Sequence, residues 1–93
     1  MHILIVEIEF DPAKAAANFK KHGVRFADAE LALHDARAVT IEDPDAEGEP
    51  RLVTLGMDAL GRVLVVVHTP RAGRTRLISA RKASRGELEH YHA

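Results

Sequence analysis

Three apolar runs separated by two short turns constrain the fold of this chain more than any other feature. The runs cover residues 51–57, 62–69 and 74–80, and the segments between them contain glycine or proline. Runs rich in Val, Ile, Leu and Thr that are interrupted in this way are typical of β-hairpins. We therefore predict an antiparallel meander of three strands, joined by loops of about four residues at 58–61 and 70–73.

The middle run is apolar at every position from 63 to 67. A strand that is apolar on both faces is covered on both sides or lies at the centre of a sheet. The chain has 93 residues, which suffice for one modest core and not for two. We therefore predict a single domain over 1–93, built around this central strand.

The N-terminal segment alternates in a way that predicts a first strand over residues 3–10. Asp11 suits the N-cap of a helix over 12–22, and Gly23 suits a left-handed C-cap. Phe19 is the expected apolar anchor of that helix.

A second helix is predicted over 26–33 and a short strand over 38–41, followed by an acidic loop over 42–50. Ser84 to Glu87 match a capping box that opens a last helix over 85–91. The order is β-α-α-β-β-β-β-α. This order is typical of an α+β domain in which helices pack on one face of a small, mostly antiparallel sheet.

Charge is distributed unevenly along the chain. Residues 1–50 carry five Lys/Arg against eleven Asp/Glu, whereas residues 51–93 carry eight against three. A basic C-terminal half indicates an anionic partner. The alternative is that the two halves neutralise each other in one folded domain.

Several classes of site are not supported by the sequence. There is no cysteine, which excludes disulfides, thiolate metal sites and a cysteine nucleophile, and which fits a reducing compartment. The histidines lack the i, i+4 spacing of a helical zinc site. The acidic loop resembles the start of a calcium-binding loop, but the twelfth position counted from Asp43 is Thr54 rather than Glu. We expect no metal, no cofactor, no signal peptide and no membrane segment.

Arginine is the most informative residue type in the basic half, because its planar fork binds phosphate bidentately and stays charged. Simple alternation predicts that Arg74, Arg76, Ile78 and Ala80 share one face of their strand. Salt bridges from Arg76 and Arg81 to acidic residues are the alternative to phosphate contact. The arginines of the basic half are Arg51, Arg62, Arg71, Arg74, Arg76, Arg81 and Arg85.

His68 ends the central strand. It can be a core-edge histidine held by hydrogen bonds, or a general acid/base. Arginines with one histidine or glutamate are chemically sufficient for RNA cleavage. The 2′-hydroxyl is the nucleophile, a base removes its proton, and cations stabilise charge on the phosphorane.

With these residues in view, the chain resembles the BrnT family of toxins from type II toxin–antitoxin pairs. The resemblance spans roughly Phe10 to Tyr91. The matching segments are Asp11-Pro12-Ala13-Lys14-Ala15 with Asn18, Lys21-His22-Gly23-Val24 with Phe26, Glu42-Asp43-Pro44-Asp45, Glu47-Gly48-Glu49 with Arg51, Gly61-Arg62, Val65-Val66-Val67, and Arg76-Leu77-Ile78-Ser79-Ala80-Arg81-Lys82-Ala83.

The resemblance implies a RelE-like, metal-independent endoribonuclease that arrests translation in the cytoplasm. It also implies a cognate DNA-binding antitoxin that neutralises the toxin, so that DNA is contacted only indirectly. Together with the chemistry above, it indicates catalytic roles for His22, Arg51, His68, Arg76 and Arg81. Substrate-binding roles are expected for Lys21, Glu49, Arg74 and Lys82.

Two other readings of the same residues remain open. A non-catalytic module could bind an acidic partner or nucleic acid through its basic sheet, with strong salt dependence and no turnover. In a purely structural reading the arginines only balance the acidic residues, and nucleic acid is not bound.

Overall fold

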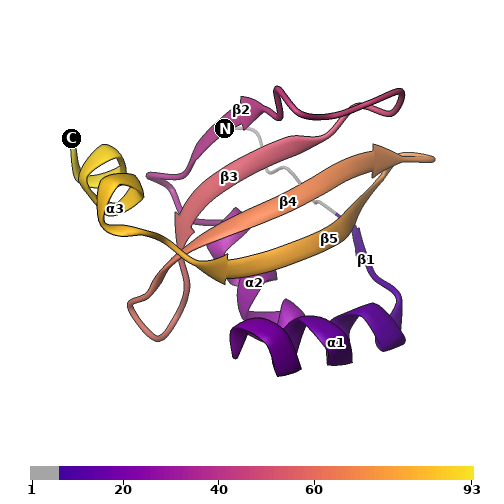
Figure 1. Ribbon diagram of the computed structural model, residues 1–93, viewed down its shortest axis with the longest axis horizontal. Coiled ribbons are helices and arrows are strands. Elements are labelled where there is room, and N and C mark those ends of the chain that lie inside the picture. Colours follow the sequence, from indigo (N-terminus) through magenta and orange to yellow (C-terminus); the bar gives the residue numbers. More distant parts are fainter. Residues whose placement is uncertain (1–6) are drawn as a thin grey trace.

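The computed structural model describes residues 7–93 and confirms the predicted α+β fold (Figure 1). Within these residues no helix is long and apolar enough to cross a membrane. The elements, in chain order, are β1 (Ile8–Glu9), α1 (Pro12–His22), α2 (Phe26–Leu33), β2 (Val39–Glu42), β3 (Leu52–Met57), β4 (Val63–Arg71), β5 (Arg74–Lys82) and α3 (Arg85–His92).

The five strands form one sheet in the order β1-β5-β4-β3-β2. The predicted meander is confirmed, because β3, β4 and β5 pair antiparallel with β4 at the centre. Strand β1 is shorter than expected and pairs parallel to β5 through Ile8 and Glu9. Residues 3–6 of the strand predicted over 3–10 lie outside the described residues.

The turn between β4 and β5 is shorter than the four-residue loop predicted at 70–73. Strand β4 continues to Arg71 and β5 begins at Arg74, which leaves Ala72 and Gly73 as the turn. Their φ angles are +51° and +78°. Two-residue turns with positive φ at both positions match the twist of antiparallel strands, so the hairpin closes tightly.

A β-bulge in β5 overturns the predicted grouping of side chains on that strand. Val67 pairs with Ser79 and His68 pairs with Leu77, so Ile78 has no partner in β4. An inserted residue shifts the alternation of the strand. Consequently Leu77 and Ala80 both belong to the buried core, whereas simple alternation had placed them on opposite faces.

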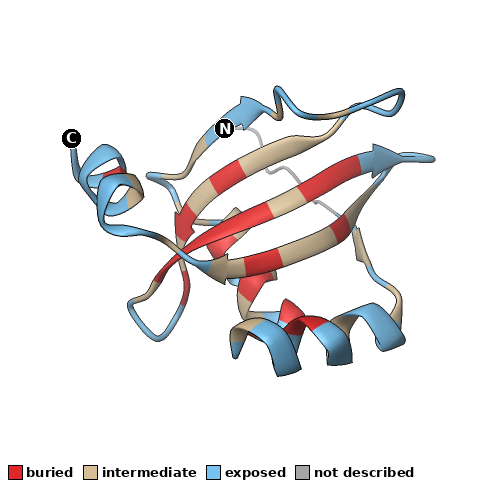
Figure 2. Ribbon diagram, viewed as in Figure 1, coloured by how far each residue is buried: buried red, intermediate tan, exposed pale blue. Residues whose placement is uncertain are grey.

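Helices α1 and α2 lie on one side of the sheet, and buried residues run along β3, β4 and β5 above α2 (Figures 1 and 2). The core joins α2 and the segment before it to β4 and β5, through Val24, Phe26, Ala29, Ala32, Leu64, Val66, Leu77 and Ala80. Strand β3 approaches α2 at Gly56. Because side chains alternate, Val53 and Leu55 point to the opposite face, where they line a hollow together with α3. Helix α3 therefore packs on the other face of the sheet from α2, whereas the sequence had placed the helices on one face.

The expectation that Phe19 anchors α1 is wrong. Its side chain is 48% exposed and lies under the guanidinium of Arg25, 5.6 Å from the ring centroid. The buried aromatic residue is Phe26, whose ring packs edge-on against Phe10 at 5.4 Å. The buried residue of α1 is instead Asn18, a polar side chain.

Asn18 attaches α1 to the edge of β5 through its amide. Its Nδ2 donates to the carbonyl oxygens of Ala80 at 2.8 Å and Val24 at 3.0 Å, and its Oδ1 accepts from the N–H of Ala80 at 3.0 Å. Strand β1 pairs with β5 only at Thr75 and Arg76. Further along the edge, Asn18 therefore satisfies backbone groups that a neighbouring strand would otherwise satisfy.

Replacing Asn18 with alanine is expected to lower the free energy of unfolding by roughly 3 kcal/mol, because buried backbone groups of Val24 and Ala80 lose their partners. Urea denaturation of the variant measures the loss. Lys20→Ala, an exposed change on the same helix, is the control and should stay within about 0.5 kcal/mol of the wild type. A loss below about 1 kcal/mol for Asn18→Ala would show that the amide is not a structural anchor.

Gly56 lets β3 approach α2 closely. A Cβ at this position would lie 2.1 Å from the carbonyl oxygen of Ala32, and that oxygen belongs to the backbone. Gly56→Ala should therefore lower the thermal midpoint and cost roughly 2 kcal/mol. Gly86→Ala adds the same methyl group in α3, where a Cβ meets nothing within 4 Å, and should be neutral or stabilising by up to about 1 kcal/mol. Equal effects of the two changes would contradict this account.

Candidate functional site

A charged groove lies where the β2–β3 loop, the β4–β5 hairpin and the start of α1 meet. Its volume is about 470 Å³. We call it the arginine groove. It is lined by Lys14, Asp45, Glu47, Glu49, Arg51, Thr69, Arg71, Arg76 and Ile78.

The local structure explains how the groove is assembled. Thr69 and Arg76 are paired neighbours on β4 and β5, and Arg71 follows on the same hairpin. The Thr69 hydroxyl donates to the carbonyl oxygen of Pro50 and so ties the β2–β3 loop to β4. This contact brings Arg51 beside the hairpin arginines.

Two of the groove's arginines are oriented by protein carboxylates. The Arg51 guanidinium lies 3.4 Å from Asp43 and 3.5 Å from the carbonyl oxygen of Asp45. The Arg76 guanidinium lies 3.5 Å from Glu9 of β1. Among residues 7–93, neither Lys14 nor Arg71 makes an ion pair within 4.0 Å. The groove thus holds cations that are available to an anionic ligand.

The groove mixes four cationic side chains with three carboxylates. Cations arranged around a hollow favour phosphate, and a carboxylate beside them can accept a proton. The part of the chain that the structure describes contains no group of three or more His, Asp or Glu side chains placed to hold a metal ion. The side chains that line the groove themselves offer acid–base and electrostatic chemistry.

A smaller hollow of about 240 Å³ adjoins the arginine groove along α1. The two share Lys14 and Ile78. We call it the α1 hollow. Its lining residues are Lys14, Ala17, Asn18, Lys21, His22, Ile78 and Ser79.

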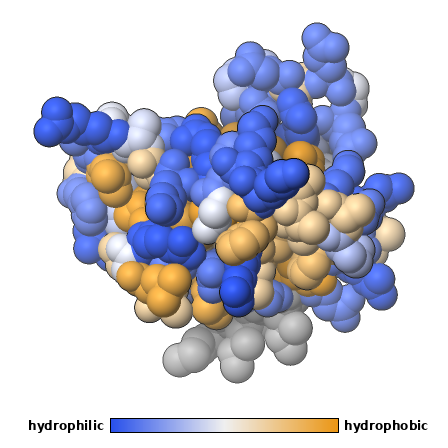
Figure 3. Space-filling model, turned by 60° about the horizontal axis from the view of Figure 1, so that its bottom comes forward, coloured by the Kyte–Doolittle hydropathy of each residue, from blue (hydrophilic) through white to orange (hydrophobic). Residues whose placement is uncertain are grey.

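On the face that Figure 3 turns forward, hydrophilic and hydrophobic side chains are interspersed rather than gathered into one apolar surface.

The structure brings together only some of the residues expected from the sequence. Glu49, Arg51 and Arg76 line the arginine groove, while Lys21 and His22 line the α1 hollow. Lys14 and Arg71 were not assigned to the site from the sequence, although both line the groove. The available signal for Lys14 was its spacing of seven residues from Lys21, which places both on one side of a helix.

His68 lies apart from the groove. Its neighbour Thr69 lines the groove, so alternation directs His68 to the opposite face of β4. His68 is 8% exposed as a residue, and its Nε2 lies 2.8 Å from the Thr54 hydroxyl. Burial lowers the pKa of His68. This geometry agrees with the reading of a core-edge histidine held by hydrogen bonds.

Arg81 is engaged in an ion pair with α3. Its Nη1 and Nη2 donate to the two carboxylate oxygens of Glu87 at 2.8 and 2.9 Å. This pairing raises the pKa of Arg81, and with the bonds from Ser84 it lowers the pKa of Glu87 to about 2. The salt-bridge alternative weighed for Arg81 is therefore what the structure shows.

The remaining basic residues of the C-terminal half also lie outside the groove. Arg74 contacts Glu7 at 3.0 Å and Glu9 at 3.8 Å. Arg62 contacts Asp58 at 2.7 Å and Asp28 at 3.2 Å. Lys82 is exposed at the end of β5 that is remote from the hairpin.

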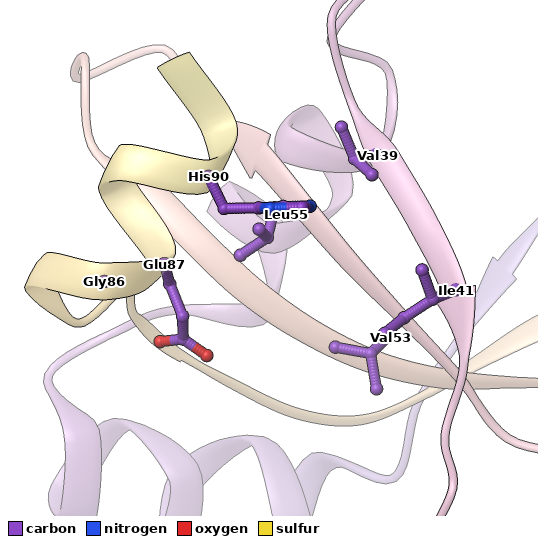
Figure 4. Close-up of a pocket in the computed structure, with 7 residues that line it drawn as sticks. All are labelled: Val39, Ile41, Val53, Leu55, Gly86, Glu87 and His90. Carbon is purple, nitrogen blue, oxygen red and sulfur yellow. The ribbon is translucent and has the colours of Figure 1, made fainter. Parts of the chain in front are cut away.

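A third hollow lies between α3 and the β2–β3 pair (Figure 4). Its volume is about 240 Å³, and it is lined by Val39, Ile41, Val53, Leu55, Gly86, Glu87 and His90. The Glu87 carboxylate is already bonded to Arg81 and to the N–H of Ser84. Among the described residues, the lining of this apolar hollow contains no Lys or Arg, in contrast to the arginine groove.

Comparison with known proteins defines the class. A family model described as "Ribonuclease toxin, BrnT, of type II toxin-antitoxin system" matches residues 10–87. The class defined by this match is that of the ribonuclease toxins of type II toxin–antitoxin systems. More particularly, the chain belongs to the BrnT family, as its sequence motifs indicated.

A solved structure supports the same assignment. The crystal structure of the Brucella abortus ribonuclease toxin BrnT is 27% identical in sequence and superimposes with a TM-score of 0.67. The match covers 87% of this chain and 100% of that chain. Comparison with curated proteins finds no match.

The Arg81–Glu87 pair gives the protein a pH-dependent contribution to stability. A carboxyl group whose pKa is lowered by folding stabilises fully above its ordinary pKa, near 4.5, and loses that contribution as the pH falls toward 2. Glu87→Gln keeps an oxygen for the capping box but removes the charge. It should cost about 1 kcal/mol at neutral pH, because partial exposure screens the pair.

Denaturation of Glu87→Gln and of the wild type across pH 2 to 7 checks this prediction. The difference between their free energies of unfolding should shrink below pH 4.5. Glu89→Gln on the exposed side of α3 is the control with the same charge change. A difference that persists unchanged at pH 2 would contradict the ion-pair account.

Proposed function

We propose that this protein is an endoribonuclease toxin that cleaves RNA without a metal ion, and that the reaction takes place in the arginine groove. The observation that carries the proposal is the convergence of four cations from separate segments of the chain around a hollow that also holds Glu49. Membership of a ribonuclease toxin family supports RNA as the substrate.

The groove's residues suit attack by the ribose 2′-hydroxyl on the adjacent phosphate. Glu49 accepts the hydroxyl proton, the 2′ oxygen bonds to phosphorus, and the bond to the 5′ oxygen breaks. The departing oxygen takes a proton from solvent, which leaves a 2′,3′-cyclic phosphate and a 5′-hydroxyl. Arg51, Arg71 and Arg76 stabilise the negative charge that develops on the phosphorane, a role that a metal ion fills in other nucleases.

This scheme assigns the other expected residues to different tasks. Arg81 and His68 support the fold from outside the groove, through Glu87 and Thr54 respectively. Arg74 and Lys82 act as peripheral cations that attract RNA. Lys21 and His22 contact RNA in the α1 hollow.

We also propose a cytoplasmic setting in which cleavage arrests translation and a cognate antitoxin neutralises the toxin. Support comes from the family description, which names a type II toxin–antitoxin system. In such a pair the antitoxin covers the groove and binds DNA, and the toxin reaches DNA only through it.

The test is RNA cleavage by purified protein in EDTA. Wild-type activity should persist, and Arg76→Gln should lower kcat by about 10²-fold, because one stabilising cation at the phosphorane is lost. Arg85→Gln, an exposed change on α3 with the same loss of charge, should keep wild-type activity.

Activity that disappears in EDTA, or an equal loss in both variants, would overturn the proposed mechanism. RNA binding without any cleavage would instead favour the non-catalytic binding module. Circular dichroism of each variant shows whether the fold is retained.

A further inference from the structure

One side of α1 carries a row of side chains at helical spacing. Lys14, Ala17, Asn18 and Lys21 follow at i, i+3, i+4 and i+7, and all four line the α1 hollow. The Asn18 amide is engaged with Ala80 and Val24, so it is not available to a ligand. The free polar groups of this row are therefore the two lysines, about 10 Å apart along the helix axis.

The α1 hollow differs from the arginine groove in its charge. Three carboxylates line the groove, whereas among the described residues the lining of the α1 hollow contains no Asp or Glu. Its charged or titratable side chains are Lys14, Lys21 and His22. An anion in this hollow meets cations that no neighbouring carboxylate opposes.

The two hollows meet at Lys14 and Ile78. A strand of nucleic acid presents phosphates at regular intervals, with an axial rise of about 3.4 Å per nucleotide when stacked. A separation of about 10 Å between the two lysines therefore corresponds to a step of a few nucleotides. One strand can place a phosphate in each hollow at the same time.

We propose that the α1 hollow is a second phosphate subsite, in which Lys21 and His22 bind a phosphate a few nucleotides away from the one that is cut. Lys14 stands at the junction and guides the backbone from one hollow to the other. The substrate class is an unpaired RNA segment of several nucleotides, the form of RNA that proteins most often bind along one strand. The inference rests on the proposed ribonuclease function and extends its site.

The position of α1 favours this role. The hydrogen bonds between Asn18 and Ala80 fix α1 on β5. Lys14 and Lys21 of α1 are therefore held at a constant distance from Arg76, which also belongs to β5. A cationic last turn also complements the helix dipole, and that effect alone would explain basic residues there. Lys20 lies in the same last turn but does not line the hollow. Substitution of Lys20 therefore tests the helix-dipole explanation alone, whereas substitution of Lys21 also tests phosphate binding.

The experiment compares cleavage of a dinucleotide, which has one phosphate, with cleavage of the same step extended by one, two or three nucleotides on either side. For the wild type, extension on one side should raise kcat/KM by roughly fivefold to tenfold. Lys21→Gln should abolish this rise. Lys20→Gln, an identical change one residue away, should keep it.

A second readout is independent of cleavage. Fluorescence anisotropy measures binding of the matching 2′-deoxy oligonucleotides, which lack the nucleophile and cannot be cut. Affinity should rise with the same extension, and Lys21→Gln should remove that rise and reduce the slope of log affinity against log salt by about 0.7.

The two readouts keep the inference separate from the proposed function. If the wild type cleaves no RNA, the proposed function fails, while the binding series still decides the subsite. The subsite is overturned if extension produces no gain in the wild type, or if Lys20→Gln and Lys21→Gln lose affinity and length dependence equally.

Discussion

The attachment of α1 to β5 by the Asn18 amide is the interaction on which the functional surface depends. Helix α1 has no buried apolar residue, and Asn18 is the side chain that it buries. Two hydrogen bonds to Ala80 of β5 and a third to Val24 take the place of the apolar stripe that usually holds a helix on a sheet. Because these bonds are directional, they set the rotation of α1 as well as its distance, and so determine which lysines face β5.

The bulge at Ile78 serves the core and the site together. It lets Leu77 and Ala80 pack in the core, while Arg76 and Ile78 on the same strand line the arginine groove. A regular strand would not combine these positions on two faces. Bulges frequently redirect side chains near active sites, and here the redirected residue is an arginine held by Glu9.

Local signals made much of the fold predictable. The caps at Asp11, Gly23 and Ser84 and the turns of the meander act within a few residues. The structure contains the three caps and both turns, although the second turn is shorter than predicted. Phe19 was mistaken for the anchor because the bonds of Asn18 reach 62 residues along the chain to Ala80. The hydrogen bond between His68 and Thr54 was also not predictable from local sequence, because it depends on the register between β3 and β4. Arg81 instead pairs locally with Glu87, a contact that the sequence left as one of two readings.

The carboxylates that pair with two of the groove's arginines have a consequence for how RNA would enter the groove. Asp43 and Glu9 already lie on Arg51 and Arg76, so the protein supplies its own counterions at these positions. An incoming phosphate exchanges places with a tethered carboxylate there rather than with dissolved ions, and few ions are released. Association at these arginines is consequently less sensitive to ionic strength than their number suggests. Selectivity for RNA then depends on how much more strongly the guanidinium binds a phosphate than it binds the carboxylate that the phosphate replaces.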